Sequence, residues 1–354
     1  AFDRVPHMRL IAKLNGFAIR PSTTRWTKSF LTERTQQVVV RDATSASVKA
    51  TSGIPQGSVL GPLLFVLFVN DLPDCAKNKL LLFADDTKLY ATNDPHSLEL
   101  DLNKLTEWSE KWHLHFNISK CKHLHIGRQA PAQRIMMNER PLELADSEKD
   151  LGVTFDAKLT FKSHIIEKAN KANSMFGIIS RSFRHLEKKT FLPLYKGMVR
   201  SHLDFAAPVY HPSTRAEIDK IEGVQRRATK QVPGLKNLTY PERLRKLKLP
   251  TLTYRRVRAD MIELYKATSG IYEPQLCSFV KMRADETERQ GTRRHQKTIY
   301  PTHSNSNIRR NAFCNRNVAL WNSLPGNVVN ASTINTFKAR LDRHWSNQPA
   351  VWDH

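Results

Sequence analysis

The sequence predicts an α+β protein, with short strands in its first part and helices in the remainder. Two apolar stretches, 80–84 and 87–91, flank a pair of turn residues and are typical of a strand hairpin. Farther along, apolar residues recur at helical spacing in 161–179. The second part is also strongly basic, because residues 151–354 hold 36 Lys and Arg against 16 Asp and Glu, whereas residues 1–150 hold 20 against 17.

The bulk composition indicates a folded protein with a polyanionic partner. With 354 residues, of which 40% are hydrophobic, the chain has room for two or three domains with their own cores. Its net charge is +23, and almost all of it falls in the second part. This asymmetry favours a catalytic body joined to a surface that binds a polyanion. A merely well-solvated surface is the alternative, and composition alone does not separate RNA, DNA and an anionic membrane.

The cysteines favour an intracellular protein. They lie far apart and form no CxxC pair, so we expect no disulfide framework. The sequence shows no signal-peptide pattern and no apolar run of about 18 residues, so we predict no membrane span. The four cysteines are Cys75, Cys121, Cys277 and Cys314.

Helices and strands are both expected in the first 75 residues. Apolar spacing predicts a helix at 4–19 and a second at 26–31. Two strands, at 36–40 and 47–51, surround a polar turn. A loop and then a strongly apolar helix at 60–72 follow.

Helices dominate the prediction for the rest of the chain. One helical stripe covers 98–112, and short strands are expected at 123–126 and 151–155. Basic helices continue to about residue 268. Residues 281–311 have too few large apolar groups for a core, which favours a loop, and a compact tail follows. Four tryptophans at helical spacing are expected in cores: Trp26, Trp108, Trp112 and Trp321.

The strongest local motif is the acidic pair Asp85-Asp86, preceded by Phe83-Ala84 and set between two apolar strands. Two adjacent carboxylates in a tight turn repel each other, and a divalent cation relieves that repulsion. Mg²⁺ prefers carboxylate oxygens combined with substrate phosphates, and a pair of such ions catalyses phosphoryl or nucleotidyl transfer. An ordinary acidic hairpin turn is the alternative, because Asp is a common turn residue.

A second motif, Gly53-Ile54-Pro55-Gln56-Gly57-Ser58, lies about thirty residues upstream. Glycines allow the backbone to approach a nucleotide closely, and the amide of Gln56 offers a donor and an acceptor to a sugar or base. On its own this segment could simply be a turn before the apolar helix. Its combination with that helix and the later Asp pair favours a nucleotide site.

These motifs resemble the central motifs of reverse transcriptases from non-LTR, LINE-type retrotransposons of the jockey-like kind. The similarity rests on the run from Gly53 to Phe65, on Asn70-Asp71-Leu72-Pro73 and on Phe83-Ala84-Asp85-Asp86-Thr87. It continues in the same order over nearly the whole chain, through Trp112–Lys120, Asp150–Val153, the basic helices at about 160–268 and the tail Ala319–Pro325.

The resemblance implies a role for each motif. Asp85 and Asp86 would be catalytic and would bind metal, with two Mg²⁺ ions expected in the intact enzyme. Lys120 would be a general acid for the pyrophosphate leaving group, and Phe2 would be the aromatic gate that excludes a ribose 2′-hydroxyl. The expected substrate-binding residues are Phe2, Pro55, Gln56 and Gly57, and the primer grip would lie at Leu151 and Gly152.

The fold implied by the resemblance is the right-hand polymerase. It would comprise a partial palm at 1–155, a helical thumb at 156–270, a basic linker at 271–311 and a small C-terminal region at 312–354. The implied reaction is RNA-templated DNA synthesis from a 3′-hydroxyl, whose partners are an RNA template, a DNA primer and dNTPs. The family also implies a location in the nucleus and cytoplasm.

The opening residues bear on how much of that activity the chain retains. Ala1-Phe2-Asp3 match the end of the family's Asp-x-x-x-Ala-Phe-Asp motif, whose first Asp, a metal ligand, would lie four residues before Ala1. Asp3 is not expected to replace it, because a carboxylate at another position along the chain has a different direction. We therefore expect an amino-terminally truncated fragment that is inactive alone.

Other interpretations stay open at this point. The chain could be a non-catalytic transposon relic that binds nucleic acid, or another palm enzyme such as an intron maturase or a viral RNA polymerase. An RNA polymerase would usually avoid an aromatic residue at Phe2. A zinc site is disfavoured, because its candidate ligands alternate as a strand does and lack the usual ligand spacing. Those candidates are His113, His115, Cys121, His123 and His125.

Overall fold

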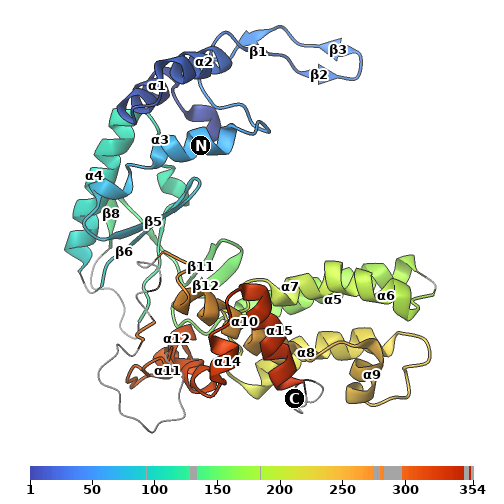
Figure 1. Ribbon diagram of the computed structural model, residues 1–354. Helices are drawn as coiled ribbons and strands as arrows, with labels where there is room; N and C mark the ends of the chain where they lie inside the picture. The colour runs from blue at the N-terminus through green and yellow to red at the C-terminus, as the bar shows by residue number, and fades with distance from the viewer. Residues whose placement is uncertain are drawn as a thin grey trace. The chain divides into compact units, whose positions relative to one another are not determined.

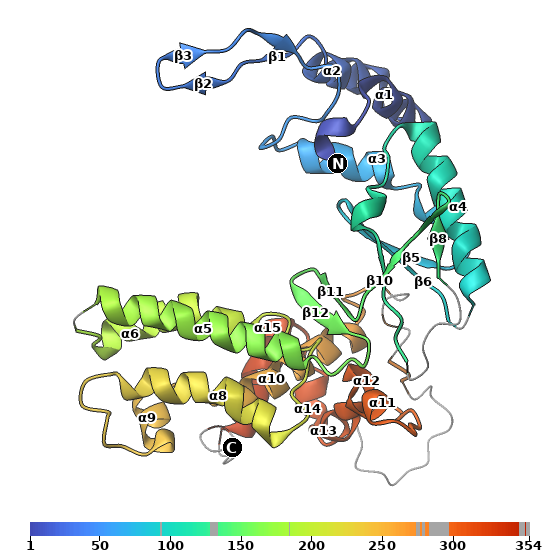
Figure 2. The same ribbon diagram turned by 180° about the vertical axis from the view of Figure 1, so that it is seen from behind.

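The chain folds into two compact units, Ala1–Asp146 and Ser147–His354, which Figures 1 and 2 show from opposite sides. Each unit has its own hydrophobic core and is described separately. Helices in the described part of the chain fall short of the length and apolar character that a membrane crossing requires. The computed structural model describes residues 1–92, 94–127, 134–183, 185–273, 277, 280–282, 297–346 and 351.

The first unit combines helices with short hairpins. Its helices are η1 (Phe2–Arg4), α1 (His7–Gly16), α2 (Pro21–Leu31), α3 (Gly61–Val69), η2 (Pro73–Cys75), α4 (Pro95–Trp112) and η3 (Ile118–Lys120). Its strands are β1 (Thr35–Gln36), β2 (Val39–Val40), β3 (Ala43–Thr44), β4 (Val48–Lys49), β5 (Lys79–Phe83), β6 (Asp86–Tyr90), β7 (Lys122–His123), β8 (Met136–Met137), β9 (Arg140–Pro141) and β10 (Glu143–Leu144). Antiparallel pairs are β1–β4, β2–β3, β5–β6 and β8–β9, whereas β7 and β10 run parallel.

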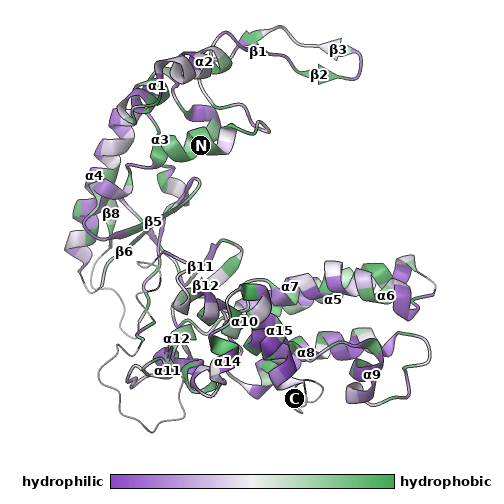
Figure 3. Ribbon diagram, viewed as in Figure 1, coloured by the Kyte–Doolittle hydropathy of each residue, from purple (hydrophilic) through white to green (hydrophobic). Residues whose placement is uncertain are grey.

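Helix α3 lies at the centre of this unit's core. It begins with Gly61-Pro62, a position where proline is tolerated because its missing N–H would have no helical partner. The rest of the helix is apolar on nearly every side (Figure 3), so it can be covered from several directions. The core side chains include Leu10 and Leu14 of α1, Phe65 and Phe68 of α3, Leu80 of β5, and Leu105 and Trp108 of α4.

A buried lysine joins three helical segments in this core. The ammonium of Lys13 in α1 donates to Asp71 Oδ1 and to Phe68 O, at 2.5 Å each. It also lies 4.0–4.9 Å from the ring centroids of Phe68, Trp108 and Trp112. Burial lowers the pKa of Lys13 below its usual value, and the hydrogen bond to Asp71 opposes that shift. The rings and the carboxylate together compensate the ammonium for its lost hydration.

The second unit is almost entirely helical. It opens with an antiparallel hairpin of β11 (Ser147–Asp150) and β12 (Val153–Asp156). Its helices are α5 (Lys162–Ser182), α6 (Lys188–Leu194), the π-helical turn η4 (Tyr195–Arg200), α7 (Ser201–Asp204), α8 (Arg215–Lys230), α9 (Tyr240–Leu247), α10 (Leu252–Thr268), α11 (Asn307–Asn311), α12 (Phe313–Arg316), α13 (Val318–Asn322), α14 (Gly326–Val329) and α15 (Ile334–Trp345).

Two clusters of buried side chains hold this unit together. The first lies among α5 to α9, where α5 and α8 run side by side in both views (Figures 1 and 2). The second joins α10 to the last helices, and in it the ring of Tyr265 stacks on Phe337 with centroids 4.4 Å apart. Trp321 is fully buried in the same cluster. The carboxy-terminal residues therefore share one core with α10.

A buried polar network links α8 to its neighbours. The fully buried carboxylate of Glu222 accepts hydrogen bonds from the Tyr240 hydroxyl and from the backbone N–H of Leu252, the latter at 2.9 Å. Gln225 donates to Tyr240 and accepts from the Tyr195 hydroxyl at 2.8 Å. Since Leu252 is the first residue of α10, the carboxylate also lies at the positive end of that helix. These contacts satisfy the buried side chains of Glu222 and Gln225.

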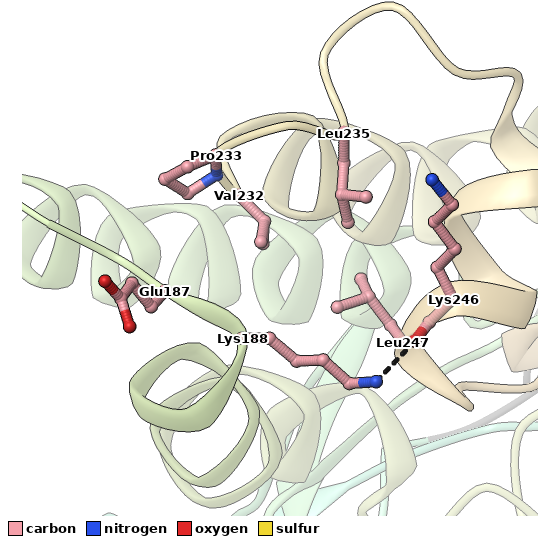
Figure 4. Close-up of a pocket in the computed structure, with 7 residues that line it drawn as sticks. All are labelled: Glu187, Lys188, Val232, Pro233, Leu235, Lys246 and Leu247. Atoms are coloured by element: carbon pink, nitrogen blue, oxygen red, sulfur yellow. Dashed lines mark hydrogen bonds between the residues drawn. The ribbon is translucent and has the colours of Figure 1, made fainter.

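A pocket of about 400 Å³ opens at the end of α9 (Figure 4). The ammonium of Lys188 donates to the backbone oxygen of Lys246 at 2.6 Å, and so satisfies a carbonyl in the last turn of α9. No predicted site residue lines this pocket. Its lining residues are Glu187, Lys188, Val232, Pro233, Leu235, Lys246 and Leu247.

The predicted α+β class is confirmed, and so are the hairpin around Asp85 and the helix that ends at Trp112. A hairpin also forms around Asp42, but its turn is Arg41-Asp42, and β3 lies inside the segment predicted as a polar turn. The prediction that Trp26 is a core residue is wrong, because this side chain is 56% exposed. The buried face of α2 consists of Thr24, Thr27 and Leu31, and Trp26 lies off that face and stacks on Phe30 instead.

The proposed domain boundaries stay predictions. The boundary between the two compact units falls between Asp146 and Ser147, inside the predicted palm segment 1–155. The predicted linker 271–311 lies partly outside the described residues, which omit 274–276, 278–279 and 283–296, and the predicted C-terminal region also extends beyond them.

Candidate active site

The predicted acidic hairpin is present. Strands β5 and β6 pair with Phe83 opposite Asp86, so Ala84 and Asp85 form a two-residue turn. Ala84 has a φ of +52°, a left-handed conformation that suits the twist of a hairpin but is unfavourable for alanine. The core holds the hairpin through the buried side chain of Leu80. Backbone strain of this kind persists only where the surroundings impose it, as they often do at functional sites.

Both carboxylates at this turn are available to a ligand. Asp85 and Asp86 are exposed, and neither side chain has a hydrogen bond or ion pair with another described residue. Among the described residues, no three His, Cys, Asp or Glu side chains gather in a group that could hold a metal ion. A cation here would therefore complete its shell with water or substrate oxygens.

The chain contains a second hairpin turn of the same local geometry. In the β2–β3 hairpin, Arg41 has a φ of +53° and is followed by the exposed Asp42. This turn holds a single carboxylate beside a basic residue. Turn geometry alone therefore does not distinguish the candidate site, whereas the second carboxylate does.

A buried carboxylate that the sequence did not single out supports the start of the acidic hairpin. Asp101 of α4 accepts hydrogen bonds from the backbone N–H groups of Lys77 and Asn78, at 2.9 and 2.7 Å, and from the Asn78 side chain. Burial tends to raise the pKa of Asp101, but these hydrogen bonds hold it below its usual value. The residues just before β5 are thus fixed to α4.

The upstream motif packs on the first residues of the chain. The backbone N–H of Ile54 donates to Phe2 O at 3.1 Å, and the side-chain amide of Gln56 donates to Asp3 Oδ1 at 2.8 Å. Two predicted substrate-binding segments, at Phe2 and at Pro55–Gly57, are therefore neighbours. The ring of Phe2 is stacked on Phe65 with centroids 4.3 Å apart, so the core of the unit orients it.

Gly53 makes this close packing possible. Its φ is +94°, and a Cβ atom there would lie 2.9 Å from both Cα and O of Asp3. The buried ring of His7 donates from Nε2 to Gly53 O at 2.8 Å, which fixes the same peptide from the other side. Gly57, with a φ of +77°, faces open space instead. The contact of His7 has no local sequence signal, because 46 residues separate the partners.

The remaining predicted residues lie on exposed turns. Lys120 is exposed at the end of η3, and no hydrogen bond or ion pair among the described residues joins it to Asp85 or Asp86. Leu151 and Gly152, in the second unit, form the two-residue turn between β11 and β12, with φ values of +44° and +82°.

The histidines weighed for zinc form two separate pairs. The ring centroids of His113 and His115 are 6.3 Å apart, and those of His123 and His125 are 6.4 Å apart. Burial, followed by the charge of His125, lowers the pKa of His123. Within the described ranges these side chains do not assemble into a set of three or more ligands.

Comparison with known proteins points to one family. Residues 1–189 match the family described as reverse transcriptase (RNA-dependent DNA polymerase). Among curated proteins, the chain is similar to the RNA-directed DNA polymerase from mobile element jockey of Drosophila melanogaster, with 30% identity over 253 residues, which is 66% of this chain and 27% of that protein.

Two further relatives come from the same organism. The probable RNA-directed DNA polymerase from transposon X-element is 28% identical over 251 residues, which is 66% of this chain and 27% of that protein. That from transposon BS is 35% identical over 182 residues, which is 47% of this chain and 20% of that protein. The matched part thus spans about a quarter of the length of the jockey and X-element relatives.

Replacing Gly53 by alanine should loosen the upstream loop. We expect Gly53→Ala to lower the free energy of unfolding by about 2 kcal/mol, because the new methyl group meets the Asp3 backbone and alanine disfavours positive φ. Denaturant unfolding and hydrogen exchange of residues 53–58 measure the effect. Gly16→Ala is the control, since a Cβ atom there has no neighbour within 4 Å. Equal effects of the two substitutions would contradict the packing described.

Removing the Asp101 carboxylate should free the start of the hairpin. We expect Asp101→Ala to destabilise the fold by about 2 kcal/mol, because two backbone N–H groups lose the buried carboxylate that accepts from them. The exposed Asp74 supplies a control, Asp74→Ala, which should have little effect.

The same carboxylate predicts a pH dependence. Because its pKa is lower in the folded protein than its ordinary value near 3.8, its stabilising effect is present above that pH and is lost as the pH falls below it. Denaturant titrations from about pH 5 to pH 3 should therefore show a smaller loss of stability in Asp101→Asn than in the parent. Identical slopes would argue against the hydrogen bonds assigned to Asp101.

Proposed function

The chain belongs to the reverse transcriptase family, among the enzymes of non-LTR retrotransposons, and on that premise we propose that it takes part in RNA-templated DNA synthesis by two-metal nucleotidyl transfer. The family generally uses a divalent metal and acts on nucleic-acid template, primer and nucleotides. The observation that carries the proposal is the strained turn that presents two exposed and unpaired carboxylates, Asp85 and Asp86. This acidic turn suits Mg²⁺, which takes one or two carboxylates together with substrate phosphates.

In this proposal Asp85 and Asp86 hold the cations at the tip of the β5–β6 hairpin. When bound, two Mg²⁺ ions would activate the primer 3′-hydroxyl and stabilise the leaving oxygens. Asp85 would be a direct ligand, and Asp86 would support the site. The rigidity of the turn matters, because the reacting atoms must be aligned to within a fraction of an ångström.

The loop at Pro55–Gly57 and the ring of Phe2 would bind the incoming nucleotide. The hydrogen bond from Gln56 to Asp3 ties the loop to the segment that carries Phe2. The loop and the Phe2 segment would therefore move together. A sugar bound by the loop would then lie against the ring of Phe2. The stack of Phe2 on Phe65 supports a gate at the ribose 2′-position. A ring held in this way would not move aside for a 2′-hydroxyl group.

Lys120 and the β11–β12 turn complete the proposed machinery. The exposed ammonium of Lys120 is free of ion pairs with described residues and would protonate the pyrophosphate leaving group. The turn at Leu151–Gly152 would hold the primer strand, and the basic helices of 156–270 would act as a thumb that binds duplex phosphates. We also propose an intracellular location in nucleus and cytoplasm.

Loss of the first carboxylate should abolish synthesis. In a polypeptide of the relatives' length that contains this chain, we expect Asp85→Asn to lower primer extension on an RNA template by about a hundredfold or more, because a charged ligand of the reacting site becomes neutral. The matched control is Asp42→Asn, which changes an exposed Asp in a turn of the same geometry.

Two outcomes would contradict this assignment. Extension that survives Asp85→Asn, or that falls equally in Asp42→Asn, would mean that the acidic turn does not serve the reaction. Iron-directed backbone cleavage gives a second readout on the 354-residue chain itself. Cleavage should cluster around Asp85 and Asp86, be suppressed by excess Mg²⁺ and disappear when both are changed to Asn.

Duplex binding should depend strongly on salt. If the basic second part contacts six to ten phosphates, raising the salt from about 50 to 200 mM should weaken binding by roughly 10³ to 10⁵. Duplexes of unrelated sequence should bind alike, because phosphate contacts carry no sequence information. Fluorescence anisotropy with the whole chain measures both effects, and a response that does not change with salt would refute this part of the proposal.

A further inference from the structure

The turn at Leu151–Gly152 is backed by an aromatic ring from another part of the second unit. A Cβ atom on Gly152 would lie 3.1 Å from Cε1 and 3.4 Å from Cζ of Phe205. The peptide backbone of the turn thus rests directly on the ring edge. The contact lies in one unit, where α5 packs against both β12 and α7, the helix that leads into Phe205 (Figure 1).

Phe205 is held in place although it is exposed. Its side chain remains 51% accessible to solvent, and Leu151 at the tip of the turn is 43% accessible. Its backbone N–H donates to Ser201 O at 3.1 Å. The preceding carboxylate, Asp204, is fixed by Arg255, whose guanidinium donates to it at 2.7 Å. The ring is therefore presented to solvent by a rigid segment, so its exposure is not that of a loose loop.

One ammonium group lies near this ring. The ammonium of Lys168 lies 6.0 Å from the ring centroid, and its neighbour Glu167 pairs with it at 3.6 Å. Three residues before Phe205, burial lowers the pKa of His202, and the charges of Lys171 and Lys168 lower it further. Both lysines thus act on the same small region.

Exposed apolar side chains are common on protein surfaces and need no explanation one by one. Phe205 differs because it combines a half-exposed ring, a turn without side-chain bulk at Gly152 and a nearby lysine, Lys168. This combination matches the way proteins bind unpaired nucleotides, with a base stacked on a ring and the backbone phosphates near cations. Residues 151–354 hold 36 basic and 16 acidic residues. This positive charge favours a polyanion as the partner over a molecule with little negative charge.

We propose that Phe205 is a stacking platform for an unpaired nucleotide of a strand held at the Leu151–Gly152 turn. The inference rests on the proposed function, in which this turn binds the primer strand. The base would lie on the exposed face of the ring, and Lys168 would contact the adjoining phosphate. Phe205 would then contact substrate directly, and Gly152 would be required because any side chain there would displace the ring.

The test compares two ligands with the whole chain. One is a duplex with a single unpaired 3′ nucleotide, and the other carries an abasic residue at that position. We expect the parent chain to bind the first about tenfold more tightly, as one stacked base provides. Phe205→Ala and Phe205→Leu should both lose that preference, and Leu keeps bulk against Gly152. Phe205→Tyr should keep it. Phe183→Ala removes another exposed phenylalanine of this unit, 41% accessible, and should not change the preference.

Each outcome decides between the proposals. Loss of the base preference in Phe205→Ala and Phe205→Leu, with an unchanged salt slope, supports stacking. A structural defect would instead weaken the binding of both ligands to the same extent. Lys168→Gln should lower the salt slope by about one. Salt-dependent binding without any base preference in the parent overturns the role of Phe205 and leaves the proposed function intact. Absence of nucleic-acid binding overturns both.

Discussion

The ammonium of Lys13 is the contact on which the first unit depends. It reaches from α1 to the rings of α3 and α4 and to the carboxylate of Asp71. Helix α1 follows the segment that carries Phe2, and α3 follows the loop that carries Gln56. Fixing these two helices to each other therefore also fixes the two segments that meet at the candidate nucleotide site. A buried charge specifies this arrangement more sharply than an apolar side chain could, because only one geometry satisfies it.

Local patterns in the sequence were sufficient for the hairpins and most helices. The turn at Ala84-Asp85 could be predicted because apolar strands flank it, and α4 could be predicted from its apolar stripe. Contacts between distant residues could not be predicted in this way. His7 supports Gly53, and Asp101 supports the start of β5, across 46 and 24 residues of sequence. No repeating pattern in the sequence links these partners. Trp26 was misplaced for the same reason, since its exposure depends on what α2 packs against.

Carboxylates in the described part of the chain differ in their burial and in their partners. Buried ones have dedicated partners, as Asp260 has in Arg316 and Glu222 has in Tyr240 and the start of α10. The pair at Asp85 and Asp86 has none among the described residues. The two adjacent exposed acids have no such structural role in the described part of the chain, and they stay accessible to a ligand.

The shared core of α10 and the last helices also bears on the order in which the protein is made. Asp260 pairs with Arg316 across 56 residues of sequence, and Tyr265 stacks on Phe337. The apolar face of α10 therefore leaves the ribosome well before its covering helices are synthesised. During that interval it stays exposed in the nascent chain and becomes a target for chaperones. If translation stopped before α15, the core of the first unit would be complete, but the core that α10 shares with the last helices would lack its cover. Such exposed apolar surface favours rapid degradation.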